Sequence, residues 1–223
     1  MKVILICISF LLVASIGGLK DLKELFKEQN VQAYKILAET QGDLDKDSID
    51  EKIVVYDTGE EGDMGTIRNI EIFKLNEKYW KLWHTSSGAV LPSQHGGPMG
   101  DPFEGITVER GCIVIYHSGG GRDKWFYTHR YRFQKGQWCL IGATIKYGEL
   151  ACNLNTFDYN LSTGKVEATI EEWPCQEEAE DEGEEKKEEF SFIAKPAKLT
   201  LMDDFYPGNN EVKIPKKDYS FYY

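Results

Sequence analysis

The sequence has few of the patterns that mark common catalytic and metal sites. It contains no CxxC pair, and no HxH or HExxH spacing joins its four histidines, His84, His95, His117 and His129. A zinc site is therefore not indicated. There is no GxSxG elbow, and no glycine-rich loop ends in a lysine–serine pair, so neither a serine-hydrolase triad nor a phosphate loop is indicated. Motifs alone therefore predict no catalytic residue and no organic cofactor.

Long apolar runs are missing beyond the N-terminus. The chain opens with "MKVILICISFLLVASIGG", one lysine followed by an apolar run and then small residues. This run is shorter than a membrane-spanning helix and has the order of a signal peptide, which we place at residues 1–17. The alternative interpretation is a buried N-terminal core helix. We expect an exported protein, periplasmic or secreted, whose mature chain has no integral membrane segment.

Positive charge is also scarce. The chain has 26 lysines and arginines against 37 acids, a net charge of −11, and much of this excess lies between Glu177 and Glu189. Elsewhere the charge is mildly acidic and mixed, which argues against nucleic acid or anionic lipid as the main partner. The acidic run at residues 176–189 predicts a solvated, mobile loop, with a docking segment or a weak cation sponge as alternatives.

Helical periodicity is confined to the N-terminal region. Leu22, Leu25 and Phe26 have the spacing of a short amphipathic helix at residues 19–29, whereas short alternating runs separated by turn residues fill the rest of the chain. This pattern predicts an all-β or β-rich fold over residues 18–223, an antiparallel meander or sandwich-like single domain. No internal repeat of about 20–50 residues supports a propeller.

The stretch "KWFYTHRYRF" predicts a half-buried strand. We expect an aromatic face turned inward, with His129 among it as a hydrogen-bonded core residue, and an opposite face turned to water or a polar rim. The expected buried residues are Trp125, Tyr127, Tyr131, Phe133 and Ile141. The expected outer residues are Thr128, Arg130 and Arg132.

The acidic stretch "GDLDKDSIDEKIVVYD" is the strongest site signal. Its candidate ligands are the side chains of Asp43, Asp45, Asp47 and Glu51 and the carbonyl of Ile49. Ca²⁺ takes about six to eight oxygen ligands, and this spacing can fold them onto one point. We predict one Ca²⁺ site in the loop at residues 43–51. The alternative is an acidic turn closed by its own Asx hydrogen bonds without a metal.

The same stretch resembles the calcium loops of FG-GAP repeats found in integrin-type propellers. It departs from that pattern at Ser48, which stands where glycine makes the turn, and a positive φ there costs serine about 1 kcal/mol. The glycine-rich block with "GDPF" and "YRFQ" resembles a family of exported bacterial proteins that have one such loop. This resemblance covers about residues 40–170 and implies the β fold and the calcium loop, but no activity.

The segment "HGGPMGDP" is either a tight structural turn or a place where a ligand approaches the backbone. The first functional interpretation is an exported, calcium-stabilised β module of the cell envelope that presents loops to a protein or a cell-wall glycan. The second is an envelope or polysaccharide hydrolase, with His95, Asp101 and His117 near one pocket. A third is an inhibitor or immunity protein whose acidic face meets a basic enzyme.

Four cysteines remain after the predicted cleavage: Cys112, Cys139, Cys152 and Cys175. A two-residue turn at Thr163–Gly164 would place the last two opposite each other, so we predict a disulfide between Cys152 and Cys175. The other two are expected on opposite sides of a shared middle strand. Two strand spacings exceed the Cα separation of a disulfide, so we expect them to be buried thiols.

Overall fold

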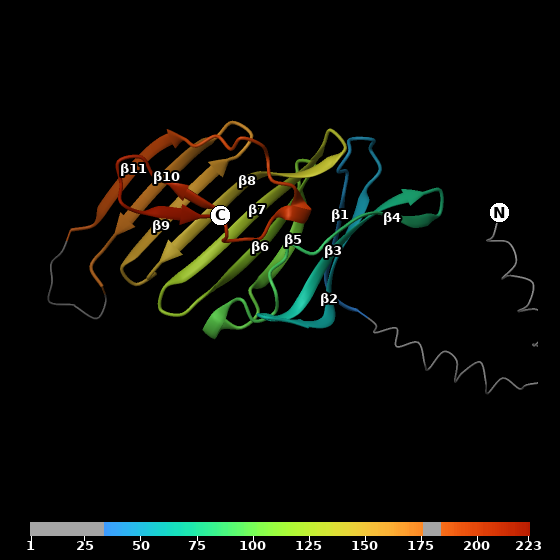
Figure 1. Cartoon of the computed structure of the whole chain (residues 1–223), viewed down its shortest axis with the longest axis horizontal. Coiled ribbons are helices and arrows are strands. Elements are labelled where there is room, and N and C mark those ends of the chain that lie inside the picture. The colour runs from blue at the N-terminus through green and yellow to red at the C-terminus, as the bar shows by residue number, and fades with distance from the viewer. Residues whose placement is uncertain (1–33, 176–183) are drawn as a thin grey trace, which may run out of the picture. The chain divides into compact units, whose positions relative to one another are not determined.

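The computed structural model describes residues 34–175 and 184–223. The strands in these ranges form three antiparallel sheets, of four, seven and two strands (Figure 1). The predicted all-β, antiparallel fold is confirmed. The predicted helix at 19–29 and the signal peptide lie outside the described residues. No helix in the described part of the chain has the length and apolar character needed to cross a membrane.

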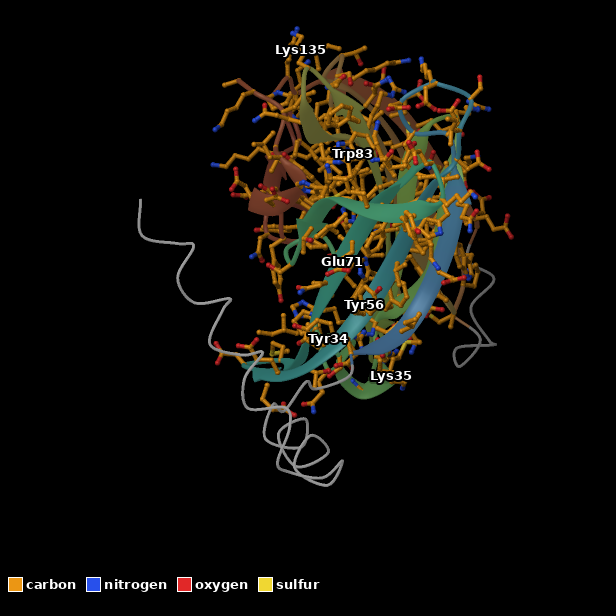
Figure 2. The ribbon with its side chains drawn as sticks, turned by 90° about the vertical axis from the view of Figure 1, so that its right-hand side faces the viewer. Tyr34, Lys35, Tyr56, Glu71, Trp83 and Lys135 are labelled. Atoms are coloured by element: carbon orange, nitrogen blue, oxygen red, sulfur yellow. A yellow bond between two sulfur atoms is a disulfide. The ribbon has the colours of Figure 1, made fainter. Side chains whose placement is uncertain are left out.

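The four-stranded sheet carries the acidic loop and has a simple up-and-down order. Its strands follow one another along the chain: β1 (Lys35–Gly42), β2 (Glu51–Gly62), β3 (Gly65–Asn76) and β4 (Tyr79–Ser86). Figure 2 turns this sheet toward the viewer and labels Tyr56 of β2, Glu71 of β3 and Trp83 of β4. Because each strand pairs only with its neighbours in sequence, β1 and β4 are the edges.

The seven-stranded sheet is a meander that runs from β5 at one edge to β11 at the other. The two-stranded sheet follows it near the C-terminus. The strands are β5 (Phe103–Glu109), β6 (Cys112–Gly120), β7 (Lys124–Gln134), β8 (Gln137–Gly148), β9 (Asn153–Asn160), β10 (Lys165–Glu172), β11 (Lys186–Ile193), β12 (Glu211–Lys213) and β13 (Ser220–Tyr222).

Two hairpins of this meander are joined by tight two-residue turns. Arg110 and Gly111 join β5 to β6 with φ of 52° and 71°, and Lys135 and Gly136 join β7 to β8 with φ of 52° and 80°. Positive φ at both central residues is the requirement of a type I′ hairpin turn, and glycine meets it without steric cost. These turns fix the register of two hairpins, β5 with β6 and β7 with β8.

The inner face of β7 is aromatic, as predicted. Tyr131 and His129 are fully buried, and the other expected aromatic residues, Trp125, Tyr127 and Phe133, are half-buried. On the opposite face, Arg132 is exposed, while Thr128 and Arg130 are half-buried. The predicted alternation is therefore correct. The expected hydrogen bond of His129 is wrong, because among the described residues both its ring nitrogens are buried without a partner.

The prediction that Ile141 is a core residue is wrong. The pairing of β7 with β8 shifts between Arg130 and Tyr131, which face Gly142 and Leu140, so Ile141 is the extra residue of a β-bulge. A bulge changes the face on which the following side chains point. Leu140 is accordingly fully buried, and Ile141 is only half-buried.

The C-terminal segment covers the inner face of the seven-stranded sheet. Phe221 of β13 stacks on Phe157 of β9, with ring centroids 4.5 Å apart, and Phe205 packs edge-on against His129 at 4.8 Å. All four side chains are at most 1% exposed. This aromatic layer closes the core that the meander alone leaves open.

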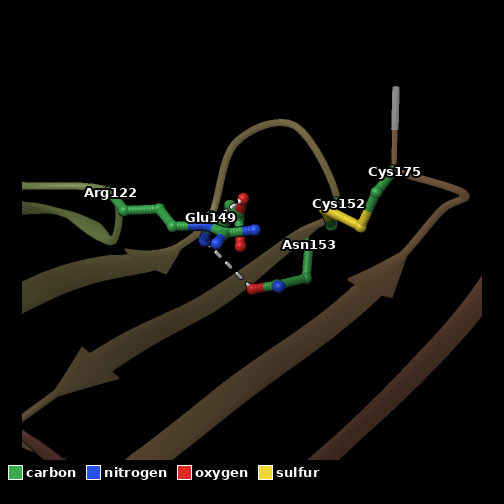
Figure 3. The surroundings of a disulfide bond; sticks show 5 residues. All are labelled: Arg122, Glu149, Cys152, Asn153 and Cys175. Carbon is green, nitrogen blue, oxygen red and sulfur yellow. Dashed lines mark hydrogen bonds and ion pairs between the residues drawn. A yellow bond between two sulfur atoms is a disulfide. The ribbon is translucent and has the colours of Figure 1, made fainter. Parts of the chain in front are cut away.

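The disulfide between Cys152 and Cys175 is present, with a Cα–Cα distance of 4.6 Å (Figure 3). The register argument behind its prediction is wrong, because β9 and β10 pair Asn160 with Lys165 across a four-residue loop. Trp173, not Cys175, therefore lies opposite Cys152, and its amide bonds to the Cys152 carbonyl. The two cysteines still meet across this open end of the hairpin.

The other two cysteines, Cys112 on β6 and Cys139 on β8, are buried free thiols on either side of β7, as predicted. The acidic run differs in part from the expected loop. Residues 186–189 form the first half of β11, and Lys186 pairs with Glu172 across the ladder to β10. Residues 176–183 lie outside the described part of the chain.

Candidate metal centre

The acidic loop connects β1 to β2. Gly42 pairs with Glu51, so residues 43–50 form the loop between the two strands. Lys46 and Ser48 have positive φ of 68° and 69°. The left-handed turn expected at Ser48 is therefore present, although serine rather than glycine makes it.

Three of the predicted ligands converge. One carboxylate oxygen from each of Asp43, Asp45 and Glu51 lies within 4.8 Å of the others. Asp47 is not part of this group, and its Oδ1 accepts a hydrogen bond from the Ile49 amide at 2.8 Å. Ile49 itself is 47% exposed. The loop thus gathers three of its acids at one point, while Asp47 and Ile49 form its outer turn.

Backbone amides hold two of these carboxylates in place. Asp43 accepts hydrogen bonds from the amides of Lys46, at 2.6 Å, and Ser48, at 3.1 Å. Glu51 accepts one from the amide of Leu44 at 2.8 Å. The bonds to Asp43 are those of the metal-free Asx alternative, and all three bonds would also preset the carboxylate positions for a cation. The loop geometry is compatible with both interpretations.

The third carboxylate is held by Lys74, which no motif in the sequence singles out. The Lys74 ammonium on β3 forms an ion pair with Asp45 Oδ2 and lies 4.0 Å from the centroid of the Trp83 ring. Among the described residues, Asp45 Oδ1 is buried without a hydrogen-bond partner. Burial acts to lower the pKa of Lys74, but its hydrogen bond to Asp45 and the surrounding negative charge outweigh burial and raise it. A positive charge therefore already stands beside the cluster.

Glu51 shows how concentrated the negative charge is. Its side chain is 1% exposed. Burial raises the pKa of the Glu51 carboxyl, the Leu44 amide acts in the opposite direction, and the negative charge of Asp45 adds to the rise. A hard cation that binds here would relieve both the burial cost and the repulsion between the acids.

The segment at residues 95–102 is a structural turn held by an ion pair between the exposed Asp101 and the buried Arg68. Asp101 binds both terminal nitrogens of Arg68, whose side chain is 2% exposed. Burial acts to raise the pKa of the Asp101 carboxyl, but the hydrogen bonds from Arg68 and from the Phe103 amide outweigh it and lower the pKa. The pair fastens this turn to β3. Asp101 is therefore engaged in structure.

The two histidines of the predicted hydrolase site lie close enough for their charges to interact, but each has its own hydrogen-bond partner. His117 is 1% exposed and its Nε2 accepts a hydrogen bond from the Leu91 amide at 3.2 Å. Burial lowers the pKa of His117 to about 3, so this imidazole is neutral. His95 Nδ1 lies 3.2 Å from the Tyr206 hydroxyl.

The pocket beside this turn has a volume of about 590 Å³, and Met99 and Glu104 are among its lining residues. Of the three predicted hydrolase residues, His117 borders it, whereas His95 and Asp101 do not. The convergence that a hydrolase requires is therefore not seen in this pocket.

No family model matches the chain, and neither a curated protein nor a solved structure matches it.

Proposed function

We propose that the protein is an exported β module that binds one Ca²⁺ in its acidic loop and presents its loops to a partner, a protein or a cell-wall glycan. The observation that carries the proposal is the convergence of the Asp43, Asp45 and Glu51 carboxylates within 4.8 Å. The resemblance of the loop to FG-GAP calcium loops supports the same ion. Mg²⁺ fits less well because it requires near-octahedral geometry and gives up its waters reluctantly.

The residues of the loop would contribute to calcium binding in different ways. Asp43 and Glu51 are preset by loop amides, and Asp45 has one buried oxygen without a partner among the described residues. Asp47 and the Ile49 carbonyl, on the outer turn, are the remaining predicted ligands. Since calcium sites in extracellular modules are weak, we expect a dissociation constant of about 10⁻⁴ to 10⁻³ M.

Lys74 acts as the resident counter-ion of the metal-free loop. Its ammonium lies in the negative electrostatic potential that would attract a Ca²⁺ ion, so the two cations would compete for Asp45. This competition predicts that calcium binding moves Lys74 away from Asp45. Because Lys74 also lies over Trp83, the indole fluorescence should report the change.

Export is supported by the disulfide and by the N-terminal sequence. The bond between Cys152 and Cys175 suits an oxidising compartment, in which such bonds persist. The signal-peptide interpretation predicts that the mature protein begins at about residue 18. Mass determination of the protein purified from its native host tests that start.

Calorimetric titration of the mature protein with Ca²⁺ tests the calcium site. We expect one site in the wild type and none in Asp45→Asn. Asp50→Asn is the matched control, because Asp50 is an exposed acid of the same loop that does not belong to the cluster. Absence of binding in the wild type at several millimolar Ca²⁺, or an equal loss in Asp50→Asn, would refute the proposed site.

A further inference from the structure

The hairpin between β3 and β4 ends in an exposed apolar and basic tip. Every residue from 75 to 82, the sequence "LNEKYWKL", is exposed, and we call this segment the hairpin tip. Tyr79 is 77% exposed, Leu82 50%, Leu75 40% and Trp80 40%. Large apolar side chains gathered on one exposed segment mark a protein or membrane interaction site.

The register of this hairpin sorts its side chains onto two faces. Leu75 pairs with Trp80, and the preceding pair on the same face is Phe73 with Leu82. The opposite face carries the pair of Tyr79 with Asn76 and the pair of Lys81 with Lys74. One face of the hairpin tip is therefore apolar, and lysines border it at the turn and on the other face.

The hairpin tip lies at the same end of the four-stranded sheet as the acidic loop. Lys74, next to the tip, forms its ion pair with Asp45 of that loop. In Figure 1, β4 extends away from the seven-stranded sheet, near the turn between β1 and β2. Ile49, at 47% exposed, adds an apolar side chain from the loop to this end. The end of the sheet thus combines exposed apolar residues, lysines and the candidate calcium site.

We propose that the hairpin tip docks onto an anionic membrane surface. Tyr79 and Trp80 are the residue types that favour the boundary between lipid headgroups and acyl chains. Lys78 and Lys81 are exposed and form no salt bridge within the described residues, so their charges are available to lipid phosphates. Each lysine near an anionic surface strengthens binding by about fivefold. Within the hairpin tip, Lys78 and Lys81 outnumber one acid, Glu77, so the tip itself has a local positive charge that an anionic surface attracts.

Calcium binding would add a second contribution to membrane docking, and this part of the inference rests on the proposed function. The acids of the loop repel an anionic surface when they carry no divalent cation. Ca²⁺ in the loop would offset that repulsion and leave the lysines of the hairpin tip to act unopposed. Docking should therefore be measurable with a chelator present and stronger with Ca²⁺.

Co-sedimentation with lipid vesicles tests the proposal. The mature protein is mixed with vesicles of equal parts phosphatidylglycerol and phosphatidylcholine, or of phosphatidylcholine alone, in EDTA or in millimolar Ca²⁺. We expect binding to the anionic vesicles only. Trp80→Ser with Leu82→Ser should weaken it by about tenfold or more through lost apolar burial. Lys78→Glu with Lys81→Glu should weaken it at least as much.

Matched controls lie at exposed positions on other strands. Ile193→Ser removes an apolar side chain that is 69% exposed on the edge strand β11, and Lys213→Glu reverses an exposed charge on β12. Both should bind the vesicles as the wild type does, and circular dichroism confirms that each variant folds.

Three results would overturn the docking proposal. These are no binding of the wild type to anionic vesicles in either condition, equal binding to neutral vesicles, and wild-type binding by the hairpin variants. The effect of Ca²⁺ on vesicle binding is tested separately with Asp45→Asn. If Ca²⁺ strengthens vesicle binding of the wild type but not of this variant, the loop is the source. If calorimetry without lipid shows no calcium binding, the proposed function fails, while lipid binding in EDTA still decides the docking.

Discussion

Lys74 neutralises part of the negative charge of the acidic loop, and its position should affect how the loop responds to a metal. Its ammonium pairs with Asp45 and lies over the Trp83 ring. A side-chain cation in the field of three carboxylates keeps them together without metal, and it opposes a divalent cation that needs the same oxygens. The loop is therefore expected to be folded in both states and to exchange one cation for another.

Removing this internal cation should tighten calcium binding. Lys74→Met keeps the length of the side chain but removes its charge, and we expect the Ca²⁺ affinity measured by calorimetry to rise by about tenfold, because one nearby repelled charge is gone. Lys81→Met is the control, since Lys81 pairs with Lys74 across the hairpin but forms no ion pair with the loop. An affinity unchanged or lower in Lys74→Met would show that Lys74 does not compete with the metal.

His117 should make the free energy of unfolding depend on pH. Its folded-state pKa is about 3, because burial disfavours the imidazolium. An unfolded histidine titrates near about 6.5, so between these values the unfolded state binds one more proton, and stability falls by about 1.4 kcal/mol for each pH unit lost. His129 shifts in the same direction.

His117→Gln isolates the contribution of this histidine, because the amide oxygen can still accept the bond from Leu91. We expect urea unfolding to show a shallower loss of stability between about pH 6 and about pH 4 in the variant than in the wild type. Equal slopes in the two proteins would mean that His117 is not held neutral by the fold.

At the scale of strands and turns, residues with a local steric requirement were predictable. Arg110–Gly111 and Lys135–Gly136 lie between alternating runs and have positive φ at both positions. The glycine in each pair indicates such a turn in the sequence. The loop before Lys165 was not predictable, because Thr163–Gly164 fits a two-residue turn as well as it fits the end of the observed four-residue loop. The bulge at Ile141 has no signal in its own residue type, so the core position it would have taken was assigned wrongly.

The disulfide joins the open ends of β9 and β10 and should stabilise the edge of the large sheet. It closes a loop with a sequence separation of 23 residues, so its loss is expected to lower the free energy of unfolding by about 2–4 kcal/mol. Urea unfolding with and without a reducing agent measures this difference. The double variant Cys152→Ser, Cys175→Ser is the control and should be insensitive to the reducing agent. A wild type equally stable in both conditions would contradict the expectation.

Across the whole described chain, the fold and part of the site followed from the sequence for different reasons. Alternation and turn residues are local, so they identified an antiparallel meander without any tertiary information. The convergence of Asp43 and Asp45 with Glu51 also depends on a short segment. The ion pair with Lys74 and the bond between Arg68 and Asp101 join residues far apart in sequence. Such contacts depend on how strands and loops are placed, which no local pattern reports.

The exposed apolar and basic hairpin tip belongs to the same scale. Leu75 and Trp80 alternate with polar residues in the sequence, and such a pattern normally indicates one buried face. Only the position of β4 at the sheet edge, beyond the core, shows that this face is uncovered. The candidate calcium loop and the hairpin tip consequently lie at one end of the four-stranded sheet.

The most direct test of the calcium site is a crystal structure of the mature protein grown with Ca²⁺. We predict one ion bound by oxygens of Asp43, Asp45 and Glu51 at about 2.3–2.6 Å, with the Lys74 ammonium moved away from Asp45. A loop that binds no ion at millimolar Ca²⁺, with Lys74 still paired to Asp45, would contradict the account.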